Sequence, residues 1–224
     1  MSYLRKVLAI VAKDVAAELR TREMLSSMFV FALLVILIFN FAFELRAEDQ
    51  ATLAPGVLWV AICFAGMLGL SRSFILEKDR GSIEGLLLAP IERSAIFLGK
   101  MLGNVLFMGL FELLILPIFV VLFNLSAGDL PLLLGVVLLG TIGFGGVGTL
   151  FSAMAVHTRA REVLLPILLF PVMVPVILAA VKLTAAIFDQ LPLSEVQNWL
   201  SLLIAFDVIF MALSFMLFDY VIEE

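Results

Sequence analysis

The sequence predicts an all-α, polytopic membrane protein. Hydrophobic residues make up 63% of the 224 residues and charged residues only 15%, and the mean hydropathy is +1.19. Soluble domains are about half apolar and about a quarter charged, so this chain has more apolar surface than one soluble core can bury. The apolar residues form six continuous runs, each long enough for a helix that spans a bilayer. A membrane β-barrel would instead show short segments with alternating polarity.

Residues 1–25 are predicted to form an amphipathic helix that lies in the cytoplasmic membrane interface. The apolar residues share one helical stripe: Leu4, Val7, Leu8, Val11, Val15 and Leu19. The cations opposite this stripe are Lys6, Lys13 and Arg20. Asp14 and Glu18 lie at its margin, a costly position in lipid, so we expect part of this helix to contact protein. Charged and apolar residues alternate here, so we expect no cleavable signal peptide.

Residues 26–218 are predicted to be a six-helix membrane domain, and 219–224 a short cytoplasmic tail. The predicted spans are 26–43, 55–74, 96–123, 130–156, 163–188 and 198–218. Lysine and arginine concentrate before the first span and in the loops after the second and fourth spans. The positive-inside rule therefore places both termini in the cytoplasm.

Prolines and glycines interrupt the spans. Prolines bend helices, and they fall at Pro117, Pro166, Pro171 and Pro175. A kinked outer gate and a static bend explain them equally well. Small residues let helices approach closely in lipid, and the candidates are Gly99, Gly103, Gly143, Gly145 and Gly148. The last three match G-x-G-x-x-G, but a dinucleotide site needs a preceding strand and a βαβ unit, so helix packing is favoured. For the first two a dimer contact stays open.

Two acids, Glu112 and Asp207, lie deep within predicted spans. Glu112 follows Lys100 by about 12 residues, or about 18 Å of helix, and Asp207 follows the interfacial Trp199 by about 8 residues. A charge near the bilayer centre costs about 2.5–3.5 kcal/mol on insertion scales. We therefore expect each acid to be neutral, paired or beside a cavity. They could line a translocation path, form a subunit contact or be protonated packing residues.

The sequence contains no pattern for catalysis or for a metal site. The only Gly-Lys pair, Gly99-Lys100, lacks the spacing of a Walker A motif, so we expect this subunit to be no enzyme and to need ATP hydrolysis by a partner. His157 is the only histidine and Cys63 the only cysteine. His157 lies at the predicted cytoplasmic end of its span, and the methionines in apolar runs are expected to pack. We therefore expect no directly bound cofactor, with haem only as a possible substrate of the complex.

The predicted cytoplasmic loop, residues 75–95, is the most informative segment. It begins with dense charge and continues as a short apolar turn that Pro90 stops. Such a segment suits docking into a cleft on another protein, with a solvated loop as the alternative. The candidate docking residues are Glu77, Arg80, Gly81, Ile83, Glu84, Gly85, Leu87 and Pro90.

The segment EKDRGSIEGLLLAPIER at 77–93 resembles the coupling loop of ABC-2-type exporter permeases. Together with LAPGVLWVA at 53–61 and GLSRSF at 69–74, it resembles the family of permease (B) subunits of the haem exporter of bacterial cytochrome c maturation. The resemblance implies a six-helix half-transporter of the bacterial inner membrane. It also implies as partners a second copy, two copies of an ABC ATPase subunit, a haem-handling membrane subunit and a haem chaperone.

The predicted function is therefore that of a permease subunit that couples ATP hydrolysis in a separate ATPase to haem delivery or to release of a haem-loaded chaperone. One alternative is an ABC-2 permease for another amphiphile, such as a lipid, glycan or drug. Another is an ion-coupled secondary transporter that uses Glu112 and Asp207, although the inverted repeats of that class are not evident. A non-transporting membrane scaffold is the third.

Overall fold

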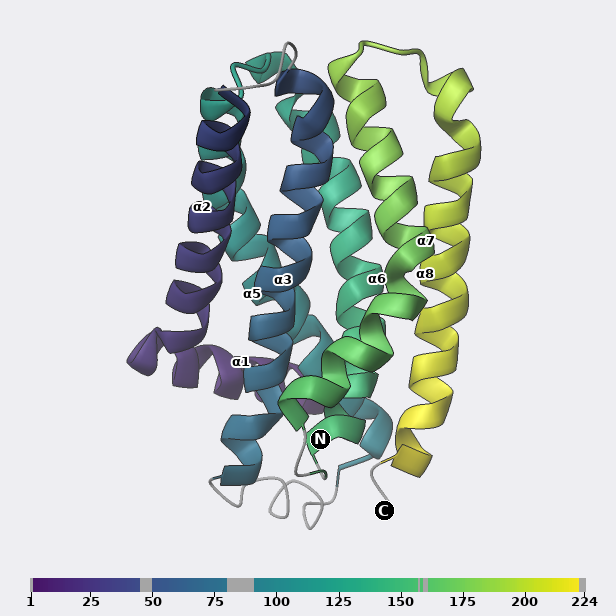
Figure 1. Ribbon diagram of the computed structural model, residues 1–224. Helices are drawn as coiled ribbons and strands as arrows, with labels where there is room; N and C mark the ends of the chain where they lie inside the picture. The colour runs from purple at the N-terminus through teal and green to yellow at the C-terminus, as the bar shows by residue number, and fades with distance from the viewer. Residues whose placement is uncertain (1, 45–49, 80–90, 157, 159–160, 222–224) are drawn as a thin grey trace.

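The computed structural model describes residues 2–44, 50–79, 91–156, 158 and 161–221. In these ranges the chain forms an upright bundle of helices, with one more helix lying across its lower end (Figure 1). The helices are α1 (Tyr3–Thr21), α2 (Glu23–Glu44), α3 (Gln50–Asp79), α5 (Arg93–Leu122), α6 (Leu130–Val156), α7 (Arg161–Phe188) and α8 (Leu193–Val221). The end of the bundle against which α1 lies is called here the α1 end. Both termini lie there as well (Figure 1).

Each of the six upright helices contains a run that is long and apolar enough to cross a membrane. This confirms the six predicted spans and the helix that precedes them. The helices are longer than the apolar runs, because polar residues continue them at the ends. Thus α3 continues to Asp79 and α5 begins at Arg93, so both ends of the predicted loop 75–95 are helical.

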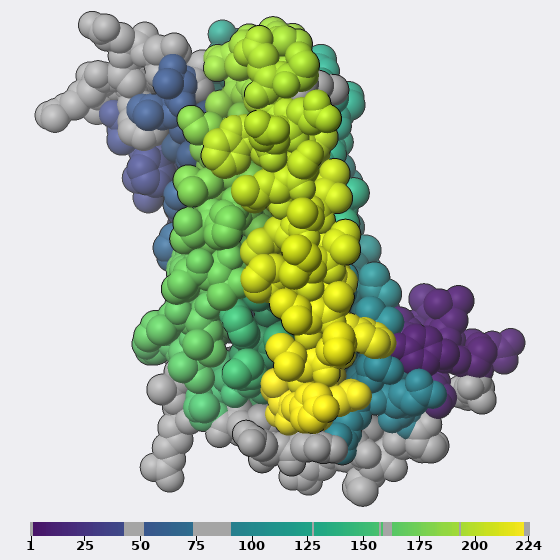
Figure 2. All heavy atoms as spheres, turned by 90° about the vertical axis from the view of Figure 1, so that its right-hand side faces the viewer, coloured from purple at the N-terminus to yellow at the C-terminus, as the bar shows by residue number. Residues whose placement is uncertain are grey.

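Helix α6 lies in the middle of the bundle, where it packs against α3, α5, α7 and α8. Helix α2 packs mainly on α3 and also contacts α5. Helix α8 runs along the full height of one face, beside α7, and α1 projects at the lower end of that face (Figure 2). The described interior is a large apolar cluster whose fully buried members include Ile36, Leu58, Phe111 and Phe119.

The turn between α1 and α2 explains why α1 leaves the bundle direction. Arg22 adopts left-handed backbone angles, with φ of 56°, and its N–H donates to the Glu18 carbonyl at 2.7 Å. The Glu18 carboxylate accepts a hydrogen bond from the Leu25 N–H at 2.8 Å, so it satisfies a donor in the first turn of α2 that has no partner within the helix. One acid therefore holds the corner between the two helices.

The opposite end of the bundle is held by contacts between its turns. The 3-10 turn η1 (Ala127–Asp129) precedes α6. Gln190, which follows α7, donates from its amide to the Asp129 carboxylate at 2.8 Å. Helix α7 contains Pro166, Pro171 and Pro175 but is continuous, and it bends visibly in Figure 1. The bend is the expected effect of proline inside a helix.

Candidate functional site: buried polar contacts between the helices

A buried lysine joins three helices at the α1 end. The Lys100 ammonium on α5 lies 3.0 Å from the Asp14 carboxylate on α1, and it donates to the Ser73 carbonyl on α3 at 3.3 Å. The Lys100 side chain is only 2% exposed and that of Asp14 is 15% exposed. Asp14 also lies 3.3 Å from the ammonium of its neighbour Lys13. The two oppositely charged groups compensate each other where water is largely excluded.

Two glycines of α5 form the surface on which α1 rests. A Cβ atom at Gly99 would lie 2.7 Å from the Ile10 Cβ, and one at Gly103 would lie 4.0 Å from the Asp14 Cβ. Ile10 and Asp14 are one helical turn apart, as are Gly99 and Gly103, so one turn of α1 lies along one turn of α5. The ion pair of Lys100 lies between these two contacts.

The face of α1 that contacts the bundle shares Val7 and Val15 with the predicted apolar stripe but also includes residues outside that stripe. Val7, Ile10 and Glu18 are its buried residues, and Asp14 lies on the same line. Leu4, Leu8 and Leu19, from the predicted stripe, face away from the bundle and are exposed. The expectation that Asp14 and Glu18 contact protein is confirmed. The acids belong to a second face, which the apolar stripe borders.

Glu112 lies in the middle of α5, 2% exposed. Its carboxyl oxygen accepts a hydrogen bond from the Thr141 hydroxyl of α6 at 2.6 Å. Nothing in an apolar run distinguishes Thr141 from an ordinary packing threonine, so the sequence did not identify this partner. The hydrogen bond satisfies one polar atom on each helix in the bundle interior.

Asp207 on α8 is 8% exposed, and neither of its carboxyl oxygens has a hydrogen-bond partner among the described residues. It lies against Gly143 of α6, whose missing side chain makes room for the carboxyl group. Gly143 is two residues from Thr141, which is about 200° around α6 and about 3 Å along it. Glu112 and Asp207 therefore approach α6 at similar depth from nearly opposite sides, and the structure does not bring them into one site.

The other predicted glycines of α6 face different neighbours. A Cβ at Gly145 would lie 2.6 Å from Val105 of α5, and one at Gly148 would collide with Leu70 of α3. Polar contacts accompany this close approach. The Asn104 amide donates to the Thr149 hydroxyl at 2.9 Å. Gly145 and Gly148 therefore bring α6 close to α5 and α3, respectively. Helix α5 also contacts α6 through the hydrogen bond between Asn104 and Thr149.

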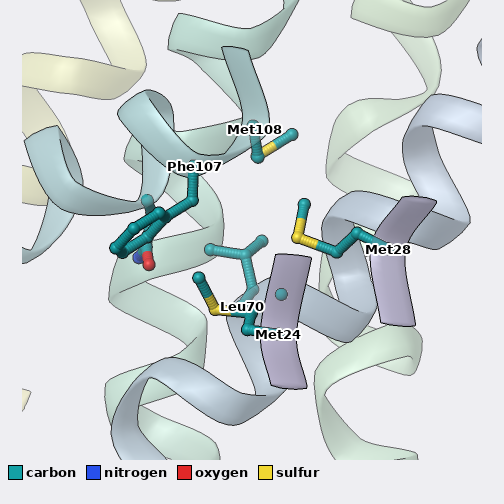
Figure 3. A pocket seen from close by; sticks show the side chains of 7 residues that line it. Met24, Met28, Leu70, Phe107 and Met108 are labelled. Atoms are coloured by element: carbon teal, nitrogen blue, oxygen red, sulfur yellow. The ribbon is translucent and has the colours of Figure 1, made fainter. Parts of the chain in front are cut away.

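A narrow pocket lies between α2, α3 and α5. Figure 3 shows side chains from the three helices converging on it: Met24, Met28, Leu70, Phe107 and Met108. Gly69 supplies room on α3, because a Cβ there would lie 2.7 Å from the Met28 sulfur. Flexible thioethers commonly fill such irregular gaps. The pocket is too narrow to hold a water molecule.

The remaining predicted residues are scattered or not described. The docking residues Arg80, Gly81, Ile83, Glu84, Gly85, Leu87 and Pro90 lie outside the described residues, as does His157. Glu77 is part of α3, and the position of its side chain is not described. Pro117 lies inside α5. Over the described ranges, no group of three or more His, Cys, Asp or Glu residues could hold a metal ion.

The family of the chain follows from comparison with known proteins. The family model of the CcmB protein matches residues 5–222. The chain belongs to the CcmB protein family. The matched range includes most of α1 and all six spans, and the positions of Lys100, Glu112 and Asp207 lie within it.

Several curated members of the CcmB family are similar over most of their length, and each is named heme exporter protein B. The protein from Pseudomonas aeruginosa is 31% identical over 196 residues, which is 88% of each chain. That from Rhodobacter capsulatus is 31% identical over 175 residues, 78% of this chain and 80% of the relative. The Haemophilus influenzae protein is 29% identical over 173 residues, 77% of this chain and 78% of the relative.

Proposed function

We propose that this chain is the membrane-embedded permease subunit of an ABC transporter complex of the haem-exporter type. The observation that carries the proposal is the CcmB family match, which extends over residues 5–222 and is accompanied by relatives named heme exporter protein B. The six spans agree with a permease. ATP hydrolysis would take place in a separate ATPase subunit, and the complex would serve cytochrome c maturation.

The proposed contact with the ATPase is the segment 75–95 at the α1 end. This segment joins α3 to α5, so a force applied to it acts on both helices at once. Lys100 of α5 binds the Ser73 carbonyl near the end of α3, which supports a concerted response of the two helices. The docking residues proposed within the segment are Glu77, Arg80, Gly81, Ile83, Glu84, Gly85, Leu87 and Pro90.

The α1 end would face the cytoplasm of a bacterium, with the chain in the inner membrane. Among the described cations, Arg20, Arg72 and Arg93 lie on helix segments at the α1 end, and Arg22 lies in the turn between α1 and α2. The described turns and helix ends at the opposite end carry mainly acids, among them Asp129, Asp189 and Glu195. This asymmetry supports cytoplasmic termini under the positive-inside rule.

Haem is proposed as the cargo of the complex and not as a resident cofactor of this subunit. ATP hydrolysis would drive either haem delivery or release of a haem-loaded chaperone. A second copy of the chain and a haem-handling membrane subunit would complete the assembly. Glu112 and Asp207 are proposed as polar elements of the spans that move during this cycle, since each lies at a contact with the central helix α6.

Copurification tests the partner assignment. An affinity-tagged chain should copurify with an ABC ATPase subunit, and the purified complex should hydrolyse ATP. Reversal of charge by Glu84→Lys should weaken this association. The matched control is Glu195→Lys, an exposed acid at the opposite end, which should leave it unchanged. A tagged chain that is folded, binds no ATPase and shows no ATP hydrolysis in its complex would overturn the proposal.

A further inference from the structure

We propose that Lys100 and Asp14 form a fixed joint that makes α1 move together with the adjoining ends of α3 and α5 when the ATPase acts. Lys100 is in this view a positioning residue for the transport cycle. The inference rests on the proposed function, because it assumes that an ATPase acts on the segment between α3 and α5.

The burial of this ion pair distinguishes it from the other ion pair between helices of the described chain. Arg72 and Glu23 also approach each other, at 3.4 Å, but their side chains are 42% and 65% exposed. Water and salt screen such a pair, and it contributes little. The Lys100 side chain is 2% exposed and that of Asp14 15% exposed, so water and salt screen their attraction far less.

The position of the joint follows from three contacts along α1. Near its start, the Tyr3 hydroxyl lies 3.3 Å from the Ser94 hydroxyl of α5. One turn before the ion pair, Ile10 packs on Gly99. These two contacts align α1 with the first turns of α5. The third contact is the ion pair, and it also connects α3, because Lys100 donates to the Ser73 carbonyl.

A buried ion pair is an inefficient way to stabilise a fold, since an apolar pair of similar volume often stabilises as well. What the charges add here is a defined geometry. Lys100 can satisfy Asp14 and the Ser73 carbonyl only while α1, α3 and α5 keep their relative positions. Exposed Leu4, Leu8 and Leu19 on the outer face of α1 are free to contact lipid, so a fixed joint would transmit motion of α3 and α5 to a helix that lies along the membrane.

A reversible covalent bond can replace the ion pair. A Cβ at Gly103 lies 4.0 Å from the Asp14 Cβ, within the range of about 3.5–4.5 Å found in disulfides. The test variant is Asp14→Cys/Gly103→Cys in a Cys63→Ala background, studied in membrane vesicles that contain the whole complex. The readouts are ATP hydrolysis and ATP-driven release of the haem-loaded chaperone, each measured with and without dithiothreitol.

With the disulfide reduced, the joint is absent. We expect the complex to assemble and hydrolyse ATP, while chaperone release falls about fivefold or more, the lower end of typical coupling between sites. With the disulfide formed, most of the release should return. Asp14→Cys alone should stay low in both conditions, and Gly103→Cys alone, which keeps the ion pair, should show the same release with and without dithiothreitol.

Equal release in the reduced and oxidised states would overturn the fixed joint, and so would an oxidised variant that hydrolyses ATP but releases no chaperone. If the cysteine pair does not accumulate, Lys100→Met/Asp14→Leu decides instead, because it removes both charges and keeps an apolar contact. It should assemble and hydrolyse ATP with the same loss of release, and parental release would overturn the joint. Absence of any ATPase from the parent complex would instead refute the proposed function.

Discussion

Single polar residues inside the spans connect particular pairs of helices. Glu112 joins α5 to α6 through Thr141, and Trp59 of α3 donates to Thr184 of α7 at 3.0 Å. The sequence indicated Glu112 and Asp207, because an acid in an apolar run is costly and therefore conspicuous. It could not indicate Thr141 or Thr184, because a hydroxyl in a span is inexpensive and its partner depends on how the helices pack. For the contact between Asp14 and Lys100, the sequence offered one indication. Each is a charged residue beside or within an apolar run, where an unpaired charge is costly.

Replacement of Glu112 by Gln tests whether its carboxyl group has a function. Gln has nearly the same volume and keeps an oxygen that can accept the Thr141 hydrogen bond, so the subunit should accumulate normally. Because an amide cannot carry the negative charge of a carboxylate, we expect cytochrome c maturation to fall about tenfold, which corresponds to ~1.4 kcal/mol in the barrier of the affected step. Covalently attached haem in membrane fractions measures this. Thr141→Ser, which keeps the hydroxyl, is the control, and maturation at the parental level in Glu112→Gln would remove the functional role.

At the scale of helices, α6 is the element on which the others converge, and its glycines set how closely they approach. Gly143 faces α8, Gly145 faces α5 and Gly148 faces α3. The sequence predicted close packing from these small residues but not which helix each would meet, since six similar apolar helices can be arranged in several ways. The ends of the helices could not be predicted from the apolar runs either, because the helices continue through polar residues. Polar residues such as Ser194 and Glu195 extend α8 back to Leu193.

Two alanine substitutions on α6 separate close packing from helix propensity. Gly145→Ala would place a Cβ 2.6 Å from Val105, whereas a Cβ at Gly135 meets nothing within 4 Å. We expect Gly145→Ala to destabilise the bundle by about 1–3 kcal/mol through overpacking. Gly135→Ala should be neutral or more stable by up to about 1 kcal/mol, because alanine favours helix.

Cys63 provides the measurement for this pair. It is the only cysteine and is buried, so a thiol-reactive dye labels it only as the bundle unfolds. The temperature at which labelling rises should be lower for Gly145→Ala than for the parent, and not lower for Gly135→Ala. Equal unfolding temperatures in both variants would contradict the close approach of α5 and α6.

At the scale of the whole molecule, the sequence fixes the number of spans because the thickness of the bilayer sets the length of each apolar run. The sequence also predicted an amphipathic helix before the spans. Which side of α1 contacts the bundle depends on the surface of α5, so it could be inferred only in part, from Asp14 and Glu18. The result is a bundle in which α1, the ends of α3 and α5, and both termini gather at one end. We propose that this end receives the action of the ATPase.

Complementation in a bacterium tests this account most directly. The gene for this chain would be expressed, together with that for its ATPase partner, in a strain that lacks its own heme exporter protein B and ATPase. Covalent haem attachment to c-type cytochromes would then be measured. We predict that attachment is restored by the pair and is lost when the ATPase can bind but not hydrolyse ATP, although both subunits still assemble. Restoration that is independent of ATP hydrolysis, or no restoration by a complex that assembles fully, would contradict the central claim.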